Sequence, residues 1–177
     1  MKKIPYLDCA KGINSYSLFY LLSELAGGKR KIRKFREKHA VRSFLDVKGI
    51  IQKTKFEKAI KSQALQFFLL LAKAEAKVHK TTLQKVHLHE VSRIGNIYRV
   101  LHIFSLLKKL KIKKFICSTI NLGRGVVKTS HGMLDIPTPA TRELLKGLRT
   151  FQKGRGELTT PSGACFARIL CKGFNSI

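Results

Sequence analysis

Acidic residues are scarce in this chain of 177 residues. Asp and Glu total 10 against 36 Lys and Arg, which gives a formal net charge of +26. A basic excess of this size predicts attraction to polyanions such as nucleic acid, anionic lipid or nucleotides, and it says nothing about the fold. A solvated, lysine-rich surface without a partner fits the same composition. We therefore expect weak, nonspecific binding to polyanions.

Cysteines and long apolar runs are also few. The longest apolar run, 67–72, is far shorter than the roughly 20 residues that cross a bilayer, so we expect no membrane span. None of the cysteines forms a CxxC pair, which favours reduced thiols in a cytoplasmic protein. An apolar fraction of 44% is typical of a globular domain. The four cysteines are Cys9, Cys117, Cys165 and Cys171.

Hydrophobic periodicity predicts short strands that alternate with amphipathic helices, and hence an α/β or α+β fold in a single compact domain. The basic segment 29–42 is the least globular stretch. The predicted strands are 3–9, 86–91 and 115–120, with extended structure again at 126–128. The predicted helices are 13–26, 44–51, 56–79, 93–109, 140–146 and one that begins at 161. Capping signals support four of the helix starts: Ser43 with Asp46, Thr54 with Glu57, Ser92, and Thr160 before Pro161.

Two histidines in the extended segment 86–91 are the first candidates for metal binding. Side chains two residues apart in a strand share a face, so His87 and His89 project together while Val86 and Leu88 point towards the core. Two imidazoles beside the carboxylate of Glu90 form half of a site for nickel, zinc, copper or iron. An isolated pair of this kind is also common in purely structural positions.

Four further residues are candidates at other points of the chain. His79 ends the preceding helix and can fold back towards the histidine pair, and Asp8 ends the first strand, so both are candidate metal ligands. Arg124 lies in a Gly-Arg-Gly segment that lacks the rest of a phosphate-loop motif and favours a tight turn, although its side chain can hold an anion. Arg124 and His131 are the candidate cofactor-binding residues.

Four stretches together resemble the N-terminal part of one family, the LarC-type nickel-insertion proteins. Their order and rough spacing match over nearly the whole chain, and the last two are specific. The stretches are Tyr6-Leu7-Asp8-Cys9 with Gly12-Ile13; Ala74 to His79 followed by Val86 to Val91; His131 to Thr141; and Gly156 to Ala164.

The resemblance implies a function in cofactor biosynthesis. Members insert nickel into a pyridinium bis-thiocarboxylate mononucleotide, in a CTP-dependent reaction of the lyase or chelatase class, to complete the nickel-pincer cofactor of lactate racemase and related enzymes. The histidine-rich motif of the family maps onto His87, His89 and Glu90. The implied partners are Ni²⁺, the cofactor precursor, and either apo lactate racemase or a separate C-terminal subunit.

Departures from the family pattern imply a shortened and impaired member. Gly95 and Arg99 occupy the places of two aspartates, and Asn14 to Ser17 replace a segment with a third carboxylate. The chain stops near the point where the C-terminal nucleotide-binding part, which would hold CTP, begins. We therefore expect residues 1–177 to form one N-terminal-type domain that does not complete nickel insertion alone.

Two other functions remain open from the sequence. A basic nucleic-acid-binding protein would use the segments 29–42 and 108–114 to contact phosphates. Aromatic residues near these segments are limited to Phe35 and Phe115, which does not support a stacking platform for single strands. A nonfunctional remnant of the family is the third possibility.

Overall fold

The computed structural model describes residues 4–28, 37 and 41–174. The chain divides into two compact units, a first unit of Met1–Ser17 with Lys111–Ile177 and a second unit of Leu18–Leu110. Helix α1 (Ser15–Leu25) begins in the first unit and continues in the second.

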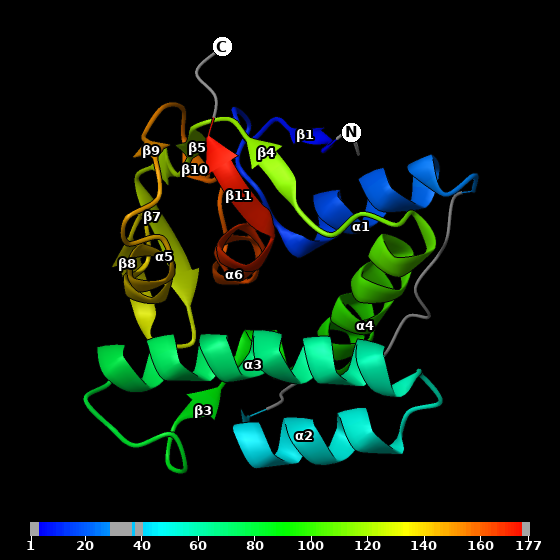
Figure 1. The fold of residues 1–177 in the computed structure, drawn as a ribbon. Helices are drawn as coiled ribbons and strands as arrows, with labels where there is room; N and C mark the ends of the chain where they lie inside the picture. The colour runs from blue at the N-terminus through cyan, green and yellow to red at the C-terminus, as the bar shows by residue number, and fades with distance from the viewer. Residues whose placement is uncertain (1–3, 29–36, 38–40, 175–177) are drawn as a thin grey trace. The chain divides into compact units, whose positions relative to one another are not determined.

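A parallel sheet of three short strands forms the centre of the first unit. Strand β4 (Phe115–Cys117) lies between β1 (Tyr6–Leu7) and β11 (Cys171–Phe174) (Figure 1). Helix α6 (Pro161–Leu170) runs directly into β11. Thr160 caps this helix, because its hydroxyl accepts a hydrogen bond from the Gly163 N–H at 3.2 Å, and Pro161 occupies the first helical position. Both features were predicted from the sequence and are confirmed.

Smaller elements complete the first unit. Helix α5 packs against α6, and six short strands form three further pairs. The helix is α5 (Pro139–Leu144), and the strand pairs are β5 (Ile120–Asn121) with β9 (Thr150–Phe151), β6 (Gly123–Arg124) with β10 (Gly156–Glu157), and the hairpin β7 (Val126–Thr129) with β8 (Gly132–Asp135).

Three helices build the core of the second unit. They are α2 (Phe44–Lys53), α3 (Lys58–Val78) and α4 (Ile94–Lys109), and α3 packs against both of the others. Figure 1 shows α2 running beside α3. The predicted stripe of α3 is buried, and each large apolar side chain in it contributes roughly 1.5–3 kcal/mol of transfer free energy. Its buried members are Ile60, Ala64, Phe67, Leu71 and Ala74.

The cap of α2 is confirmed, and the predicted cap of α3 is wrong. The Ser43 hydroxyl accepts from the Asp46 N–H, and the Asp46 carboxylate accepts from the Ser43 N–H. Thr54 instead ends α2, because its hydroxyl donates to the Ile51 carbonyl at 2.8 Å. Helix α3 therefore begins four residues later, after Glu57, with no side-chain cap.

The predicted cap of α4 is also wrong. Ser92 belongs to a 3-10 turn, η1 (Glu90–Ser92), and its hydroxyl donates to the His89 carbonyl at 2.8 Å. The first backbone N–H of the helix, that of Ile94, donates instead to the Glu37 carboxylate at 2.9 Å. This carboxylate also pairs with Arg42, and the hydrogen bond from Arg42 lowers the pKa of Glu37.

The strands are shorter than the sequence predicts. The segment 115–120 breaks into β4 and β5, because the Cys9 N–H donates to the Ser118 hydroxyl at 2.7 Å rather than to a backbone carbonyl. The segment 86–91 keeps only β3 (His87–Leu88), which pairs antiparallel with β2 (Arg42–Ser43) before η1 begins.

The mixed α/β class is confirmed, and a single domain stays a prediction. No helix in the described part of the chain is long and apolar enough to cross a membrane. Most of the basic segment 29–42 lies outside the described residues.

Candidate metal and anion sites

His87 lies in β3, and His89 follows the strand as the residue that precedes the turn η1. Val86 and Leu88 are buried at 2% and 0% exposure, whereas His87 is exposed and His89 is half-buried. The ring centroids of His87 and His89 lie 6.4 Å apart. Because the His89 carbonyl accepts hydrogen bonds from the Ser92 backbone and hydroxyl, the turn η1 holds the second histidine in place. The structure thus brings the predicted pair together.

The end of helix α3 adds an acid that was not predicted from the sequence. The Glu75 Oε2 lies 3.7 Å from the His79 Nε2, one helical turn away. Burial raises the pKa of Glu75 to about 7, and the nearby charge of Glu90 acts in the same direction. The contact with His79 is too long for a hydrogen bond, so burial controls this pKa. The spacing of four residues between Glu75 and His79 was the available signal.

We call Glu75, His79, His87, His89 and Glu90 the histidine cluster. All five belong to the second unit. In the described residues, no three His, Cys, Asp or Glu side chains are arranged to hold a metal ion together. The cluster therefore offers a pair of imidazoles with carboxylates on neighbouring segments, rather than a closed coordination sphere.

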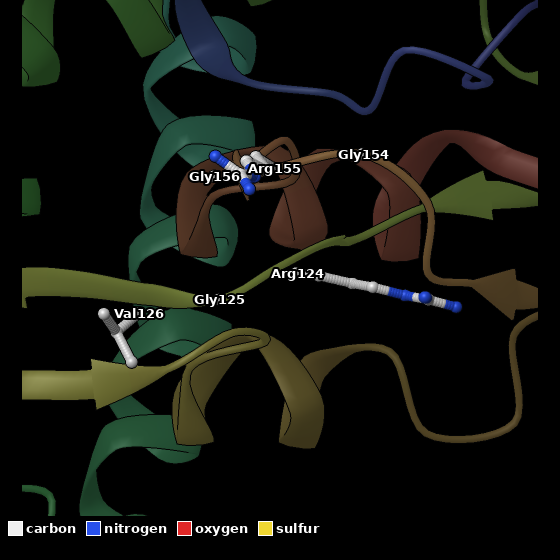
Figure 2. A pocket seen from close by; sticks show the side chains of 6 residues that line it. All are labelled: Arg124, Gly125, Val126, Gly154, Arg155 and Gly156. Atoms are coloured by element: carbon white, nitrogen blue, oxygen red, sulfur yellow. The ribbon is translucent and has the colours of Figure 1, made fainter.

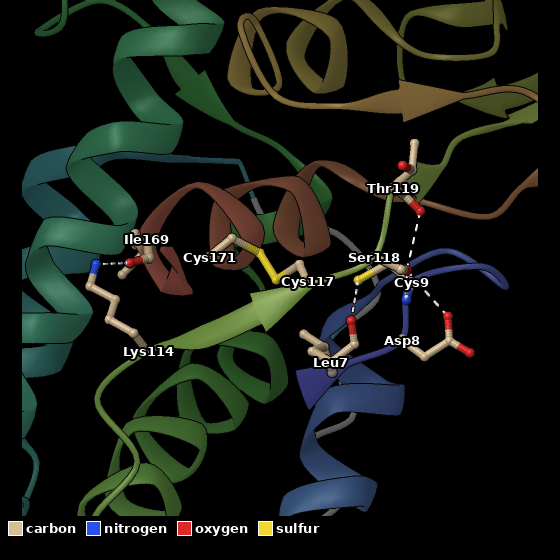
Figure 3. The surroundings of a disulfide bond; sticks show 9 residues. All are labelled: Leu7, Asp8, Cys9, Lys114, Cys117, Ser118, Thr119, Ile169 and Cys171. Carbon is tan, nitrogen blue, oxygen red and sulfur yellow. Dashed lines mark hydrogen bonds between the residues drawn. A yellow bond between two sulfur atoms is a disulfide. The ribbon is translucent and has the colours of Figure 1, made fainter. Parts of the chain in front are cut away.

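Asp8 lies in the first unit and takes part in a different network. Its Oδ1 accepts from the Ala10 N–H at 2.8 Å. The same oxygen accepts from the Ser118 hydroxyl at 3.2 Å, and that hydroxyl also accepts from the Cys9 N–H (Figure 3). Burial, with a smaller contribution from Asp8, raises the pKa of Cys9 to about 12. A thiol that stays protonated at neutral pH is a poor metal ligand. This network supports the turn after β1, and Asp8 as a metal ligand stays a prediction.

The expectation of four reduced thiols is wrong. A disulfide joins Cys117 on β4 to Cys171 on β11, with Cα atoms 5.8 Å apart (Figure 3). The two strands are parallel neighbours in one sheet, which brings together residues 54 positions apart. No local spacing indicates such a pair. Cys9 and Cys165 are free and buried.

A hollow of about 600 Å³ surrounds Arg124 in the first unit. Arg155 lines it as well, and this residue was not predicted, although Gly154-Arg155-Gly156 repeats the Gly-Arg-Gly pattern of 123–125. Figure 2 shows the two arginines on adjacent segments of chain. We call this cavity the GRG hollow; it is lined by Arg124, Gly125, Val126, Gly154, Arg155 and Gly156.

His131 occupies the turn of the β7–β8 hairpin. It is exposed, and its N–H donates to the Thr129 hydroxyl at 3.1 Å. It does not line the GRG hollow, so the structure does not group it there with Arg124.

Several lysines of the basic segment 108–114 make internal contacts. Lys108 pairs with Glu57, the Lys109 ammonium donates to the Ala26 carbonyl at 3.0 Å, and Lys114 donates to the carbonyl of Ile169. These three lysines therefore make contacts within the chain, and a nucleic-acid interface on this segment stays a prediction.

Comparisons with known proteins agree with each other. The family model described as nickel insertion protein matches residues 7–177. The pyridinium-3,5-bisthiocarboxylic acid mononucleotide nickel insertion protein of Desulfitobacterium hafniense (strain DSM 10664 / DCB-2) is 37% identical over 139 residues, which cover 78% of this chain and 35% of the relative. The protein of the same name from Thermotoga sp. (strain RQ2) is 38% identical over 125 residues, 70% of this chain and 31% of the relative. The chain thus spans about a third of the length of these relatives. No solved structure matches it.

Proposed function

We propose, from the premise that this chain belongs to the nickel insertion protein family, that it delivers Ni²⁺ to a pyridinium-3,5-bisthiocarboxylic acid mononucleotide. The name of the relatives supplies the ion and its acceptor. The observation that carries the proposal for this chain is the proximity of two imidazoles, that of His87 in β3 and that of His89 just after it.

Two imidazoles suit a protein that must release its metal. Neutral imidazole nitrogen is a good ligand for nickel, and two such ligands leave most coordination positions to water or to an incoming ligand. The thiocarboxylate groups of the acceptor can take those positions and then displace the histidines. Glu90, next to His89 in the chain, places a carboxylate near the pair and favours the approach of a cation. A closed site of four protein ligands would hold the ion too firmly for transfer.

Three finer parts of the proposal come from the family resemblance. They are CTP as a co-substrate, apo lactate racemase or a separate C-terminal subunit as a partner, and the cytoplasm as the location. An assay with and without CTP, and with and without the C-terminal part of a relative added as a separate protein, tests the first two.

Calorimetric titration with Ni²⁺ tests the role of the histidine pair. We expect the double variant His87→Ala/His89→Ala to bind nickel at least about tenfold more weakly than the unmodified chain, because each lost ligand leaves a position that water fills. His102→Phe is the matched control: His102 packs edge-on against Phe56, with ring centroids 5.0 Å apart, so phenylalanine removes an imidazole and keeps the ring contact. Equal nickel affinity in the double variant and the control would remove the pair from the site.

A second assay measures nickel insertion into the nucleotide. The chain is incubated with the nucleotide, Ni²⁺ and CTP, with and without the added C-terminal part, and the product is tested for activation of apo lactate racemase. Activation that requires this chain and is lost in the double histidine variant supports the proposal. Activation that is the same without the chain contradicts it.

A further inference from the structure

The GRG hollow is built from two Gly-Arg-Gly segments that pair with each other. Strands β6 and β10 run antiparallel, with Arg124 opposite Gly156 and Gly123 opposite Glu157. Arg124 lies in β6, and Arg155 comes immediately before β10. Both arginines are exposed, and both line the same cavity.

The four glycines allow a backbone that other residues rarely adopt. Gly123, Gly125, Gly154 and Gly156 all have positive φ, between 80° and 105°. A Cβ on Gly123 would meet the Gly156 carbonyl oxygen at 1.9 Å, so the two segments approach as closely as they do only because this residue has no side chain.

Two side-chain amides, one on the buried Asn121 and one on the exposed Gln152, hold the segments together. The Asn121 Oδ1 accepts from the Gly123 N–H at 3.1 Å and from the Lys153 N–H at 3.0 Å, so it links both segments. Asn121 is only 4% exposed, and its Nδ2 donates to the Ala10 carbonyl. The Gln152 side chain donates to the carbonyls of Gly123 and Ile136 at 3.1 and 3.0 Å. The hollow is therefore a supported structure with a fixed framework.

The two guanidinium groups are available to a ligand. Within residues 4–28, 37 and 41–174, the side chains of Arg124 and Arg155 make no hydrogen bond or ion pair; the backbone of Arg124 belongs to the β6–β10 ladder. A planar guanidinium matches the oxygens of a phosphate in a bidentate manner. The volume of about 600 Å³ lies in the range of small-molecule sites.

We propose that the GRG hollow binds the phosphate of the mononucleotide that accepts the nickel. This inference rests on the proposed function for the identity of the ligand, and on the paired arginines and glycines for its place. Figure 2 shows the Arg124 and Arg155 side chains extending in different directions, so in this proposal they turn towards the phosphate oxygens when it binds, and the glycine backbone lets the phosphate come close to the chain. These residues are binding residues and take no part in metal transfer.

Calorimetry with nicotinic acid mononucleotide, a pyridinium mononucleotide, tests the site on the full chain at physiological ionic strength. We expect measurable binding of this probe and at least about tenfold weaker binding of its riboside, which lacks the phosphate. Arg124→Ala/Arg155→Ala should lose affinity by about tenfold or more. Replacing both arginines by lysine, which keeps the charge without the bidentate geometry, should give an intermediate loss.

The control is Lys11→Ala/Lys172→Ala, which removes two exposed cations of the first unit outside the hollow. Its affinity should stay within about twofold of the unmodified chain, because distant surface charges are screened at this ionic strength. Equal binding of nucleotide and riboside, or equal loss in the lysine control and the arginine variants, overturns the proposal. Competition by a single-stranded oligonucleotide is a further test. The proposal is overturned if the oligonucleotide displaces the probe at a lower total concentration of phosphate groups than inorganic phosphate does.

Nickel titration of the same variants separates this inference from the proposed function. Arginine variants that lose the nucleotide but keep nickel affinity support the separate phosphate site. A chain that binds the nucleotide through its arginines but never binds nickel supports this inference and contradicts nickel delivery. A chain that binds nickel and keeps its nucleotide affinity without the arginines contradicts this inference alone.

Discussion

Substitution of the buried acid Glu75 by glutamine should stabilise the metal-free protein at alkaline pH. Its pKa is raised from the ordinary 4.5 to about 7, so the ionised form is less stable in the folded protein than in the unfolded chain. At 1.36 kcal/mol per pKa unit, this difference corresponds to about 3 kcal/mol of lost stability above pH 7. The side chain keeps 18% exposure, so solvent recovers part of this cost, and we expect a gain of about 1–2 kcal/mol from Glu75→Gln.

The pH dependence gives this prediction its sign. Below the unfolded pKa of 4.5 the carboxyl is protonated in both states and costs nothing; the penalty grows as pH rises from there to about 7 and is constant above. Thermal unfolding with a chelator at pH 8 should therefore show a midpoint higher by about 2–8 °C in Glu75→Gln, and little difference at pH 4.5. Glu24→Gln, on the exposed side of α1, controls for the change in net charge. A glutamine variant that is less stable at pH 8, or equally stabilised at both pH values, would refute the reasoning.

Two further predictions concern thiols and glycines. The folded protein should show no thiol that reacts with a disulfide reagent at pH 8, because Cys9 and Cys165 are both buried and burial raises the pKa of each. Unfolding without reductant should expose these two thiols. A reactive thiol in the folded state would contradict this prediction. Gly163→Ala should destabilise by about 1–3 kcal/mol, because a Cβ there would lie 1.7 Å from a backbone oxygen. Gly49→Ala, in open space on α2, should stabilise by about 0.5–1 kcal/mol in the same urea titration, and equal effects of the two substitutions would contradict the packing argument.

Local patterns in the sequence predicted the helical part of the fold well. The stripe of α3, the capping box at Ser43 and the Thr160 cap depend on residues at most four positions apart, and the chain cannot separate such residues in space. The wrong predictions involve distant partners. Glu37 satisfies the first N–H of α4 from 57 residues away, which left Ser92 for another role. The disulfide joins cysteines 54 residues apart.

In the candidate sites, too, the sequence predicted the features that depend on neighbouring residues and missed those that depend on distant ones. The two-residue spacing predicted that His87 and His89 lie close together, and their ring centroids are 6.4 Å apart although β3 ends at Leu88. The charge of Glu90 reaches Glu75 only because the turn η1 lies near the end of α3, and that proximity depends on how the chain returns between them. Arg155 likewise joins Arg124 through the pairing of β6 with β10, which places Gly156 opposite Arg124. The repeated Gly-Arg-Gly pattern was visible in the sequence. Only the pairing of the two strands brings both segments to one hollow that two arginines line. That proximity is why a motif typical of a turn becomes a candidate phosphate site.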